Sequence, residues 1–401
     1  MIKYIFKRVI IFNFVLFLVL AQLCRGDIIV SPAGPVKLSK ADGFSGNPTI
    51  TWNPTSKRFA VFWLDNRSGD WEIFFSFIKS DSSIDKSQKK IDYKADSYSL
   101  PSVAYIGGSS SYGLIWNGNP VLGNVLFYER IKSDATMDNL TILKYLTGIV
   151  DKSAIVTRGS KFGVAFTDSA VDPSLNYIYF CEVKSDGALN TPPVNLCNTL
   201  SNNSLNSSIA TDESKYAVAF SNNSGEIYEI YVAIMDSDGG IDSLKKISEN
   251  CSNGLAPDIV YGNNEYGLVY QDQVGGHFDI FFQRVSKSGS KNGGRFNISS
   301  NFGDSKNPQI VFNGKEYGVV WQDDSLGSSD IFFARISSEG QLIEPQSVIA
   351  GADQALQNPD ISWSGSNYGY GITWHKYDSS NTEVYFTTVK IRDQSNMFYL
   401  Y

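Results

Sequence analysis

The sequence has few of the residues that bind transition metals or act as catalytic nucleophiles. It contains two histidines and four cysteines, without a Cys-x-x-Cys motif, so we expect neither a zinc site nor another metal or cofactor. No Ser/His/Asp order, glycine-rich phosphate loop or Cys/His dyad is present, which argues against the enzyme classes that depend on them. A glycosidase with two carboxylates stays open, because paired acids from separate segments leave no linear motif.

Long apolar runs are missing beyond the N-terminus, so we expect no membrane-spanning segment in the mature chain. Residues 1–26 have the basic start and short apolar run of a signal peptide. Cleavage after Gly26 would leave residues 27–401 as the mature protein. A lipoprotein signal ending at Cys24 is the alternative, although Leu23 fits that class poorly. The sequence therefore predicts a secreted or periplasmic protein, or one anchored by a lipid on Cys24.

Blocks of lysine and arginine are absent as well. Loss of residues 1–26 would remove four basic residues and no acidic ones, which takes the formal net charge from −7 to −11. A chain this acidic repels phosphate backbones, so we expect no nucleic-acid partner. It favours a neutral or cationic ligand instead.

Three cysteines would remain in the mature chain, enough for one disulfide and one free thiol in an oxidising compartment. Cys181 and Cys197 lie at similar distances from a turn around residues 188–189. If the flanking segments pair as antiparallel strands, these two cysteines come within bridging range. We therefore predict a Cys181–Cys197 disulfide, with a Cys197–Cys251 bridge between neighbouring repeats as the alternative.

A unit of about 50 residues repeats along the whole chain. Its copies start 53, 52, 54, 50, 51 and 51 residues apart, a spacing that indicates a repeat architecture. The seven starts are Pro48, Pro101, Ser153, Ser207, Pro257, Pro308 and Pro359. Each unit contains four short β-rich runs separated by turn residues.

The second run of every unit is apolar on both faces and holds a small residue after its first aromatic, as in Tyr317-Gly318-Val-Val-Trp321. Such runs are typical of strands covered on both sides. The small residue predicts a close approach by the backbone of an adjacent strand.

The two ends of the chain are out of phase with the repeat. The last unit ends without a clear fourth strand, whereas residues 35–39, ahead of the first unit, match fourth-strand segments such as 295–299. A closed ring explains this offset, because the first segment can complete the last unit. We therefore predict one domain over residues 27–401, an all-β, seven-bladed β-propeller with four-stranded antiparallel blades, closed by the N-terminal strand.

The first unit contains Pro-Thr-Ile-Thr-Trp at residues 48–52 and Phe-Ala-Val-Phe-Trp-Leu-Asp-Asn-Arg-Ser-Gly-Asp-Trp-Glu-Ile-Phe-Phe at residues 59–75. In these two segments it resembles the repeats of TolB-like propellers. Longer repeats of secreted bacterial propeller proteins are more similar still. The resemblance implies a propeller that binds proteins, and it carries no catalytic residues. TolB itself has a shorter repeat and an additional α/β domain that is not visible in this chain.

Residues that recur in every unit are expected to serve the fold, so function is sought among residues that occur once. By this criterion the acids that end the second strand or precede the third are structural. Loops between second and third strands meet the linkers between units on one rim of a propeller. The candidate ligand-binding residues on that rim are Arg67, Asp70, Trp71, His277, Asp324 and His375.

Asp236-Ser-Asp-Gly-Gly-Ile-Asp242 resembles a short calcium loop, but it lacks EF-hand spacing, and Asp-Gly is ordinary hairpin chemistry. Two functional hypotheses remain. The first is a non-catalytic, monomeric binding module outside the cytoplasm whose rim engages a protein or a surface glycan. The second is an extracellular glycoside hydrolase or lyase that uses rim carboxylates. Convergent carboxylates with raised pKa values would favour the enzyme.

Overall fold

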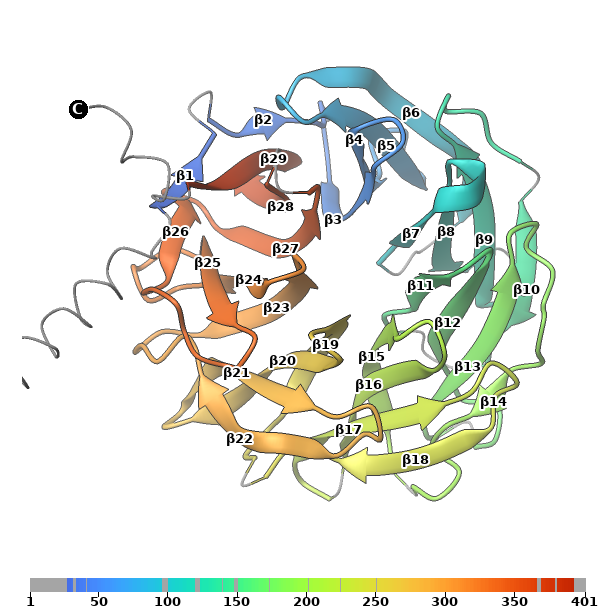
Figure 1. Cartoon of the computed structure of the whole chain (residues 1–401). Helices are drawn as coiled ribbons and strands as arrows, with labels where there is room; N and C mark the ends of the chain where they lie inside the picture. Colours follow the sequence, from blue (N-terminus) through green and yellow to red (C-terminus); the bar gives the residue numbers. More distant parts are fainter. Residues whose placement is uncertain are drawn as a thin grey trace, which may run out of the picture.

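The predicted fold is confirmed by a computed structural model, in which seven antiparallel sheets surround a central channel as the blades of a β-propeller (Figure 1). The structure describes residues 27–392, apart from 32–33, 41, 96–99, 120–122, 139, 148–150, 173, 201, 224, 250, 366–368 and 379–380. Within these ranges no helix is long and apolar enough to cross a membrane. In the same described ranges the one helical element is a short 3₁₀ turn, η1 (Gly107–Ser109).

Each blade contributes one strand to each of four concentric rings. The inner strands, which line the channel, are β3 (Ser45–Asn53), β7 (Ser102–Ile106), β11 (Ala154–Arg158), β15 (Ser204–Thr211), β19 (Leu255–Gly262), β23 (Ser305–Phe312) and β27 (Leu356–Trp363). The second strands are β4 (Arg58–Asp65), β8 (Ser111–Gly118), β12 (Lys161–Asp168), β16 (Tyr216–Asn223), β20 (Glu265–Val274), β24 (Glu316–Asp323) and β28 (Tyr370–Asp378).

The third strands are β5 (Trp71–Lys79), β9 (Val125–Lys132), β13 (Tyr177–Lys184), β17 (Tyr228–Met235), β21 (His277–Val285), β25 (Asp330–Ser337) and β29 (Asn381–Arg392). The outer strands of the first six blades are β6 (Ile84–Ala95), β10 (Thr141–Tyr145), β14 (Val194–Asn195), β18 (Ile241–Lys246), β22 (Lys291–Asn297) and β26 (Ser347–Ala350). In blade seven the outer position is taken by β1 (Asp27–Val30) and β2 (Val36–Lys37), which both pair with β29.

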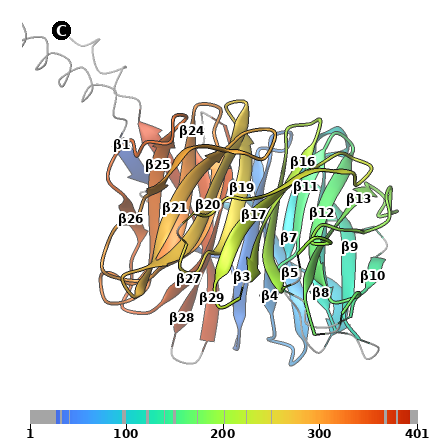
Figure 2. The same ribbon diagram turned by 90° about the horizontal axis from the view of Figure 1, so that it is seen from below.

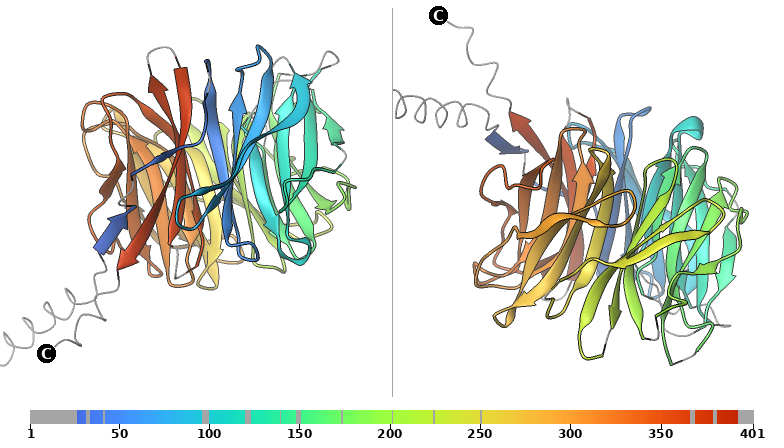
Figure 3. Two further views of the ribbon diagram at one scale, coloured as in Figure 1. Left: turned by 90° about the horizontal axis from the view of Figure 1, so that it is seen from above. Right: turned by 60° about the horizontal axis from the view of Figure 1, so that its bottom comes forward.

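Side views show the strands running between two rims (Figures 2 and 3). We call the rim on which the inner strands begin the linker rim. It carries the loops between second and third strands, such as 324–329, and the linkers between blades, such as 298–304. The opposite rim carries the remaining hairpins, such as 236–240.

Neighbouring blades are joined by an aromatic ring packed against a glycine. A Cβ atom added to Gly318 would lie 2.7 Å from the Tyr370 ring of the next blade, and one added to Gly371 would lie 2.4 Å from the Phe59 ring of blade one. The same contact recurs at Gly113, Gly163 and Gly267. The small residue of the second strand therefore makes room for a neighbouring side chain rather than for the backbone expected from the sequence, and the contact between Gly371 and Phe59 joins the two ends of the ring.

The predicted closure is confirmed by the hydrogen bonds of β2. Val36 and Lys37 pair with Phe386 and Tyr385 (Figure 3, left). Just after β2, Ser39 Oγ accepts a hydrogen bond from the Val384 amide at 2.8 Å and donates one to Glu383.

In blade five the corresponding hydroxyl, that of Ser299, accepts from the Ile280 amide at 2.9 Å and donates to Asp279 at 2.9 Å. The N-terminal segment thus reproduces in blade seven the contacts that a fourth strand makes inside a continuous blade. Pairing of β1 with the end of β29 extends the closure beyond the segment predicted from the sequence.

Candidate functional site

The inner strands of five blades carry a bulge where they face the channel. The residue just before the unit start is left-handed in these blades, with φ between 48° and 56°, and the register of the inner and second strands shifts beside it. These residues are Asn47, Asn206, Ala256, Asn307 and Asn358. Asparagine is among the few non-glycine residues that adopt this conformation readily, which explains its recurrence.

The asparagine side chains form a hydrogen-bonded series around part of the channel. Asn307 Nδ2 donates to Asn358 Oδ1 at 2.8 Å, and Asn358 Nδ2 donates to Asn47 Oδ1 at 2.7 Å. Their backbone amides are also bound, because those of Asn307 and Asn358 donate to Gln271 and Gln322 at 2.9 and 3.0 Å. These bonds fix the bulges, so the residues that follow them point into the channel at defined positions.

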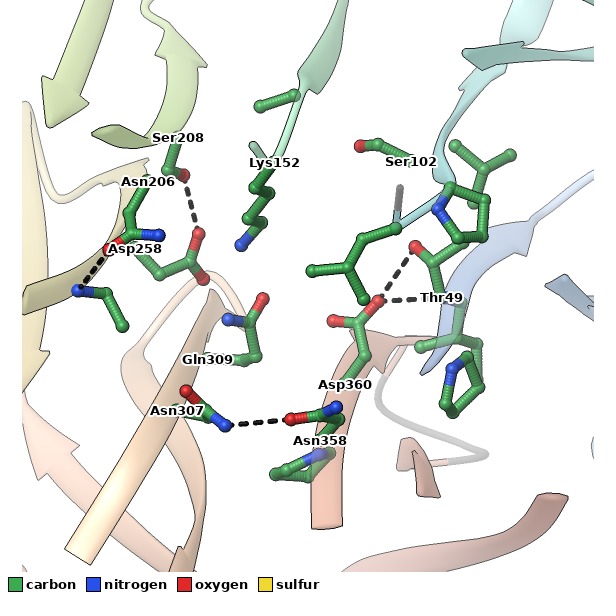
Figure 4. A pocket seen from close by; sticks show the side chains of 18 of the residues that line it. Thr49, Ser102, Lys152, Asn206, Ser208, Asp258, Asn307, Gln309, Asn358 and Asp360 are labelled. Carbon is green, nitrogen blue, oxygen red and sulfur yellow. Dashed lines mark hydrogen bonds between the residues drawn. The ribbon is translucent and has the colours of Figure 1, made fainter. Parts of the chain in front are cut away.

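A cavity of about 260 Å³ lies in the channel, and inner strands from all seven blades contribute to its wall. Its polar residues include Thr49, Ser102, Lys152, Asn206, Ser208, Asp258, Asn307, Gln309, Asn358 and Asp360 (Figure 4). Residues one position before or after the unit start dominate this set. The polar wall therefore comes from equivalent positions of the repeat that are occupied by different side chains.

Two carboxylates of this wall hold neighbouring inner strands together. Asp258 accepts hydrogen bonds from Ser208 Oγ at 2.6 Å and from the Ile310 amide at 2.9 Å. Asp360 accepts from Thr49 Oγ1 at 3.0 Å and from the Ile50 amide at 2.9 Å (Figure 4). Each acid thus bridges its blade to a neighbour while its side chain is partly exposed to the cavity.

Burial raises the pKa of both carboxyl groups, that of Asp360 to about 6. The negative charge of Asp258 raises the pKa of Asp360 further, whereas the positive charge of Lys152 lowers both pKa values. The protein surrounds these groups closely even though the channel reaches them, and desolvation therefore dominates.

Lys152 provides the positive charge of the cavity and points into it (Figure 4). Within the described part of the chain its ammonium group takes part in no hydrogen bond or ion pair. It occupies in blade three the place that an asparagine occupies in blades one, four, six and seven. Its charge is therefore available to a ligand.

The structure distributes the six candidate residues of the rim over different environments. Arg67 is tied to its own blade: its Nε donates to Asp65 at 2.7 Å, its Nη1 donates to Gln88 at 2.6 Å, and its guanidinium lies over the Phe74 ring at 4.4 Å. Asp70 is partly exposed on the same loop. Arg67 therefore stabilises the fold of blade one, as Asp65 does.

Trp71 and His375 are brought together by Phe44 between blades one and seven. The Phe44 ring lies 5.4 Å from Trp71 and 5.9 Å from His375. His375 is buried, and its Nδ1 accepts a hydrogen bond from the Asn47 amide at 3.2 Å. Burial lowers its pKa to about 4.

His375 therefore takes the role that Gln271 and Gln322 play in blades five and six, and its neutral ring supports a bulge. Trp71 keeps part of its ring at the surface.

His277 and Asp324 lie on the linker rim of blades five and six, apart from that cluster. His277 is partly exposed, with Nε2 3.9 Å from Asp279. Asp324 is exposed, and its Oδ1 accepts a hydrogen bond from the Asp304 amide at 2.6 Å. The six residues thus form no single constellation.

The three cysteines are free and buried, which differs from the predicted Cys181–Cys197 disulfide and from its alternative with Cys251. The register explains the difference. Tyr179 pairs with Asn195, and Cys197 Sγ accepts a hydrogen bond from the Ile178 amide at 3.4 Å. Cys197 therefore lies opposite the start of β13, several residues away from Cys181.

The loop that resembled a calcium site is a hairpin on the opposite rim. Asp236 Oδ1 accepts hydrogen bonds from the amides of Asp238 and Gly240 at 3.0 and 2.8 Å. In the described ranges, no group of three or more His, Cys, Asp or Glu side chains is placed to hold a metal ion.

The cavity residues Lys152, Asp258 and Asp360 were not among the sequence candidates. A signal for them exists, because the position after the unit start is Thr49, Ser102, Ala154, Ser208, Asp258, Gln309 or Asp360 in successive units. The criterion of non-recurrence applies to these positions as well as to loops, and only the inner strands meet at the centre of the ring.

Comparison with known proteins supports the fold alone. No protein-family model matches the chain, and no curated protein sequence matches it. The propeller domain of the Trilobed protease from Pyrococcus furiosus, described as having an open velcro topology, aligns with a TM-score of 0.54 at 9% identity over 90% of this chain and 100% of that domain.

Two whole enzymes also align. Pyrococcus horikoshii acylaminoacyl peptidase gives a TM-score of 0.52 at 11% identity over 88% of this chain, which spans 52% of the peptidase. Trypanosoma rangeli sialidase in complex with 2,3-difluorosialic acid gives 0.50 at 11% identity over 88% of this chain and 59% of the sialidase. At these identities the likeness extends to the β-propeller and not to an activity.

Proposed function

We propose that the chain is an exported, monomeric binding module that engages a protein partner through its linker rim. Of the two predicted ligand classes, a protein or a surface glycan, the apolar surface of this rim favours a protein. The resemblance to TolB-like propellers, which implies protein binding, points the same way.

The observation that carries the proposal is the unequal distribution of exposed apolar side chains. The most exposed large apolar side chain is Phe302, at 100% of its maximal exposure. The others on the linker rim are Tyr145, Val171, Val274, Leu326 and Tyr377. On the opposite rim, within the part of the chain that the structure describes, the comparable side chains are Ile84, Met137 and Leu189, none exposed by more than 41%. Exposed apolar surface concentrated on one face is typical of an interaction site.

Phe302 is held outward by an ordered linker. The Asn301 side chain donates to Asp323 at 2.7 Å, and the Asp324 amide donates to the Asp304 carbonyl at 3.2 Å. A Cβ atom on Gly303 would lie 2.4 Å from the Ser325 amide nitrogen, so the linker packs directly on the neighbouring loop. An aromatic ring that is preorganised in this way loses little entropy on binding, and such rings are common hot spots.

The charge of the linker rim indicates a basic partner. Its loops and linkers carry Asp42, Asp70, Asp151, Asp172, Glu226, Glu249, Asp304, Asp324 and Asp353, against Lys40 and Arg67, and against Lys152, whose side chain points into the channel. Complementary charge would steer a partner that presents lysine or arginine around an apolar centre. The opposite rim is acidic too, so the exposed apolar side chains, and not the charge, distinguish the two rims. The negative charge indicates only that the partner is basic.

The test uses the mature protein with a photo-crosslinking residue at position 302, or at Met137 of the opposite rim as control. A partner captured from position 302 alone is then purified, and its affinity is measured. Phe302→Ala should weaken binding by about 2 kcal/mol, and Met137→Ala should leave it unchanged. Equal capture from both rims, capture of a glycan or of a second copy of this chain, or unchanged affinity of Phe302→Ala would contradict the proposal.

A carbohydrate-active enzyme is the second candidate, and one observation favours it. Asp258 and Asp360 share one cavity, and burial raises both pKa values, as a general acid requires. Hydrolysis of a polysaccharide by the purified protein, lost in both Asp258→Asn and Asp360→Asn, would replace the binding function by this one. Absence of turnover on a broad polysaccharide panel would leave the binding module as the function.

A further inference from the structure

The channel cavity has more free hydrogen-bond acceptors than donors. Gln309 uses its amide nitrogen on the Pro308 carbonyl at 2.7 Å, and Asn307 uses its amide nitrogen on Asn358. Within the described residues no donor reaches Gln309 Oε1 or Asn307 Oδ1. Each oxygen of Asp258 accepts one bond, which leaves it capacity for more. A ligand rich in donors suits such a wall.

The charged groups of the cavity are two acids and one base. When Asp258 and Asp360 are both ionised, their carboxylates and the Lys152 ammonium group sum to one negative charge. Burial disfavours this charge, because it raises the pKa of both acids. A ligand with one positive charge would neutralise it, and a charged hydrogen bond in such a place is stronger than one at the surface.

The cavity is small, and its remaining wall is apolar. Its volume of about 260 Å³ lies just below the range of drug-sized pockets, roughly 300–1,000 Å³. Val103, Ile155 and Ile209 line the side of blades two to four. The occupant must therefore be compact, with polar groups on one side and carbon-bound hydrogens on the other.

We infer that the channel cavity binds a compact ligand bearing one ammonium group and several hydroxyl groups, of which a monomeric amino sugar is the simplest kind. The ammonium group pairs with the carboxylates of Asp258 and Asp360. Hydroxyl groups donate to Gln309 and Asn307, and Lys152 donates to a ligand oxygen. This site lies inside the ring and is independent of the rim that engages a protein.

The first test measures binding of three probes to the mature protein by calorimetry at pH 7: glucosamine, glucose and N-acetylglucosamine. The three share most of their hydroxyl groups, and only glucosamine carries an ammonium group. We expect glucosamine to bind at least about ten-fold more tightly than the other two, since a hydrogen bond to a charged group is stronger than one between neutral groups. Equal affinities, or no binding of any probe at millimolar concentration, would overturn the inference.

Variants then locate the site. Asp258→Asn should lower glucosamine affinity about ten-fold and that of glucose much less, because it removes the charge while its carbonyl oxygen can still accept the bond from the Ile310 amide. Asp353→Asn removes an exposed carboxylate outside the cavity and should change neither. Circular dichroism confirms that each variant is folded.

Lys152→Met keeps both carboxylates and their contacts between blades, so it tests the charge without endangering the fold. Loss of the competing cation should strengthen glucosamine binding several-fold and weaken that of glucose. If the variant instead loses glucosamine, or if glucuronate binds the native protein better than glucosamine and requires Lys152, the cavity is an anion site and the inference is wrong.

Discussion

The inner strands of blades two and three differ from those of the other five blades where the chain turns into the channel. β7 and β11 are five residues long, whereas the other inner strands have eight or nine. Leu100 and Lys152 replace the left-handed residue, and neither has a positive φ. The series of asparagine side chains is therefore absent on that side, and the cavity gains an apolar residue and a cation.

This difference separates two uses of one repeat position. In the five bulged blades the position serves the ring, because its amide, and its side chain where it is asparagine, bind to neighbouring blades. In blades two and three the residue at this position is not part of a bulge, and the Lys152 side chain can face a ligand. Repetition thus marks what the fold needs, and its interruption marks where chemistry can be placed. Substitutions on one side of this comparison at a time test it.

The largest effect is expected from breaking the asparagine series. Asn358→Val removes two side-chain hydrogen bonds and places a β-branched residue at φ 48°. The free energy of unfolding should fall by about 3 kcal/mol, from the lost bonds and the backbone strain together. Leu100→Val, at the equivalent position of blade two, should cost about 1 kcal/mol or less. Urea unfolding followed by tryptophan fluorescence compares them, and equal costs would show that the series contributes nothing.

The second prediction concerns the bulge of blade one and its histidine. Burial lowers the pKa of His375 to about 4, below its unfolded value, so the unfolded state binds more protons between pH 4 and 6.5. The stability from this group is present above pH 6.5 and is lost as the pH falls toward 4, about 3 kcal/mol in all.

His375→Gln, which restores the residue of blades five and six, should keep the bond from Asn47 and remove this loss. Measurement of Tm from pH 4 to 7 tests this prediction: the Tm of the variant, relative to that of the native protein, should rise as the pH falls. Parallel curves would contradict the assignment of this titration to His375.

The third prediction has the opposite sign and a similar size. Burial raises the pKa of Asp360 to about 6, so the folded state binds more protons between pH 4 and 6. Stability from this group is therefore greatest near pH 4 and is lost as the pH rises to 6, by about 3 kcal/mol.

Asp360→Asn keeps an acceptor for the Ile50 amide. The Tm of this variant, relative to that of the native protein, should rise as the pH rises from 4 to 6. The same Tm series, recorded for both variants, separates the two titrations that offset each other in the native protein. A variant that gains at low pH instead would show that Asp360 is stabilised as an anion.

The smallest effect should come from completing the asparagine series. Ala256 is the one bulged residue of the five that is not asparagine, and it is held at φ 48°. Asparagine tolerates this conformation better than alanine, so Ala256→Asn should raise the free energy of unfolding by about 1 kcal/mol. Leu100→Asn, where the backbone is not left-handed, should give no gain. Urea unfolding at pH 7 measures both, and a gain at both positions would point to a cause other than the bulge.

Most of the fold could be predicted because it depends on local patterns that repeat. The period gave the number of blades, and residues 35–39 predicted the closing strand from a match to one segment, 295–299. The disulfide was wrong because its argument assumed a regular hairpin. β14 is only two residues long, and the path from β13 to β14 places Asn195 opposite Tyr179, which moves Cys197 away from Cys181.

The site was harder to predict because it depends on contacts between blades. His375 was selected because it interrupts the repeat. Its ring accepts the hydrogen bond from the Asn47 amide, as Gln271 and Gln322 accept the equivalent bonds in other blades, and the sequence does not show this bond. Asp258 and Asp360 lie 102 residues apart in sequence, and no local pattern shows that they face one cavity. Of the rim candidates, Asp324 lies in the loop that follows β24 and His277 is the first residue of β21, and their role in binding stays a prediction.

The closure of the ring also fixes the order of events during synthesis. Val36 and Lys37 leave the ribosome roughly 350 residues before their partners Phe386 and Tyr385. At about 5–20 residues per second, the first segment waits roughly 20–70 s for its strand. Throughout that time, the rest of the propeller has an unpaired edge at each end, which can pair with another chain. Completion of the ring therefore depends on keeping one short N-terminal segment unpaired until the last blade has been made.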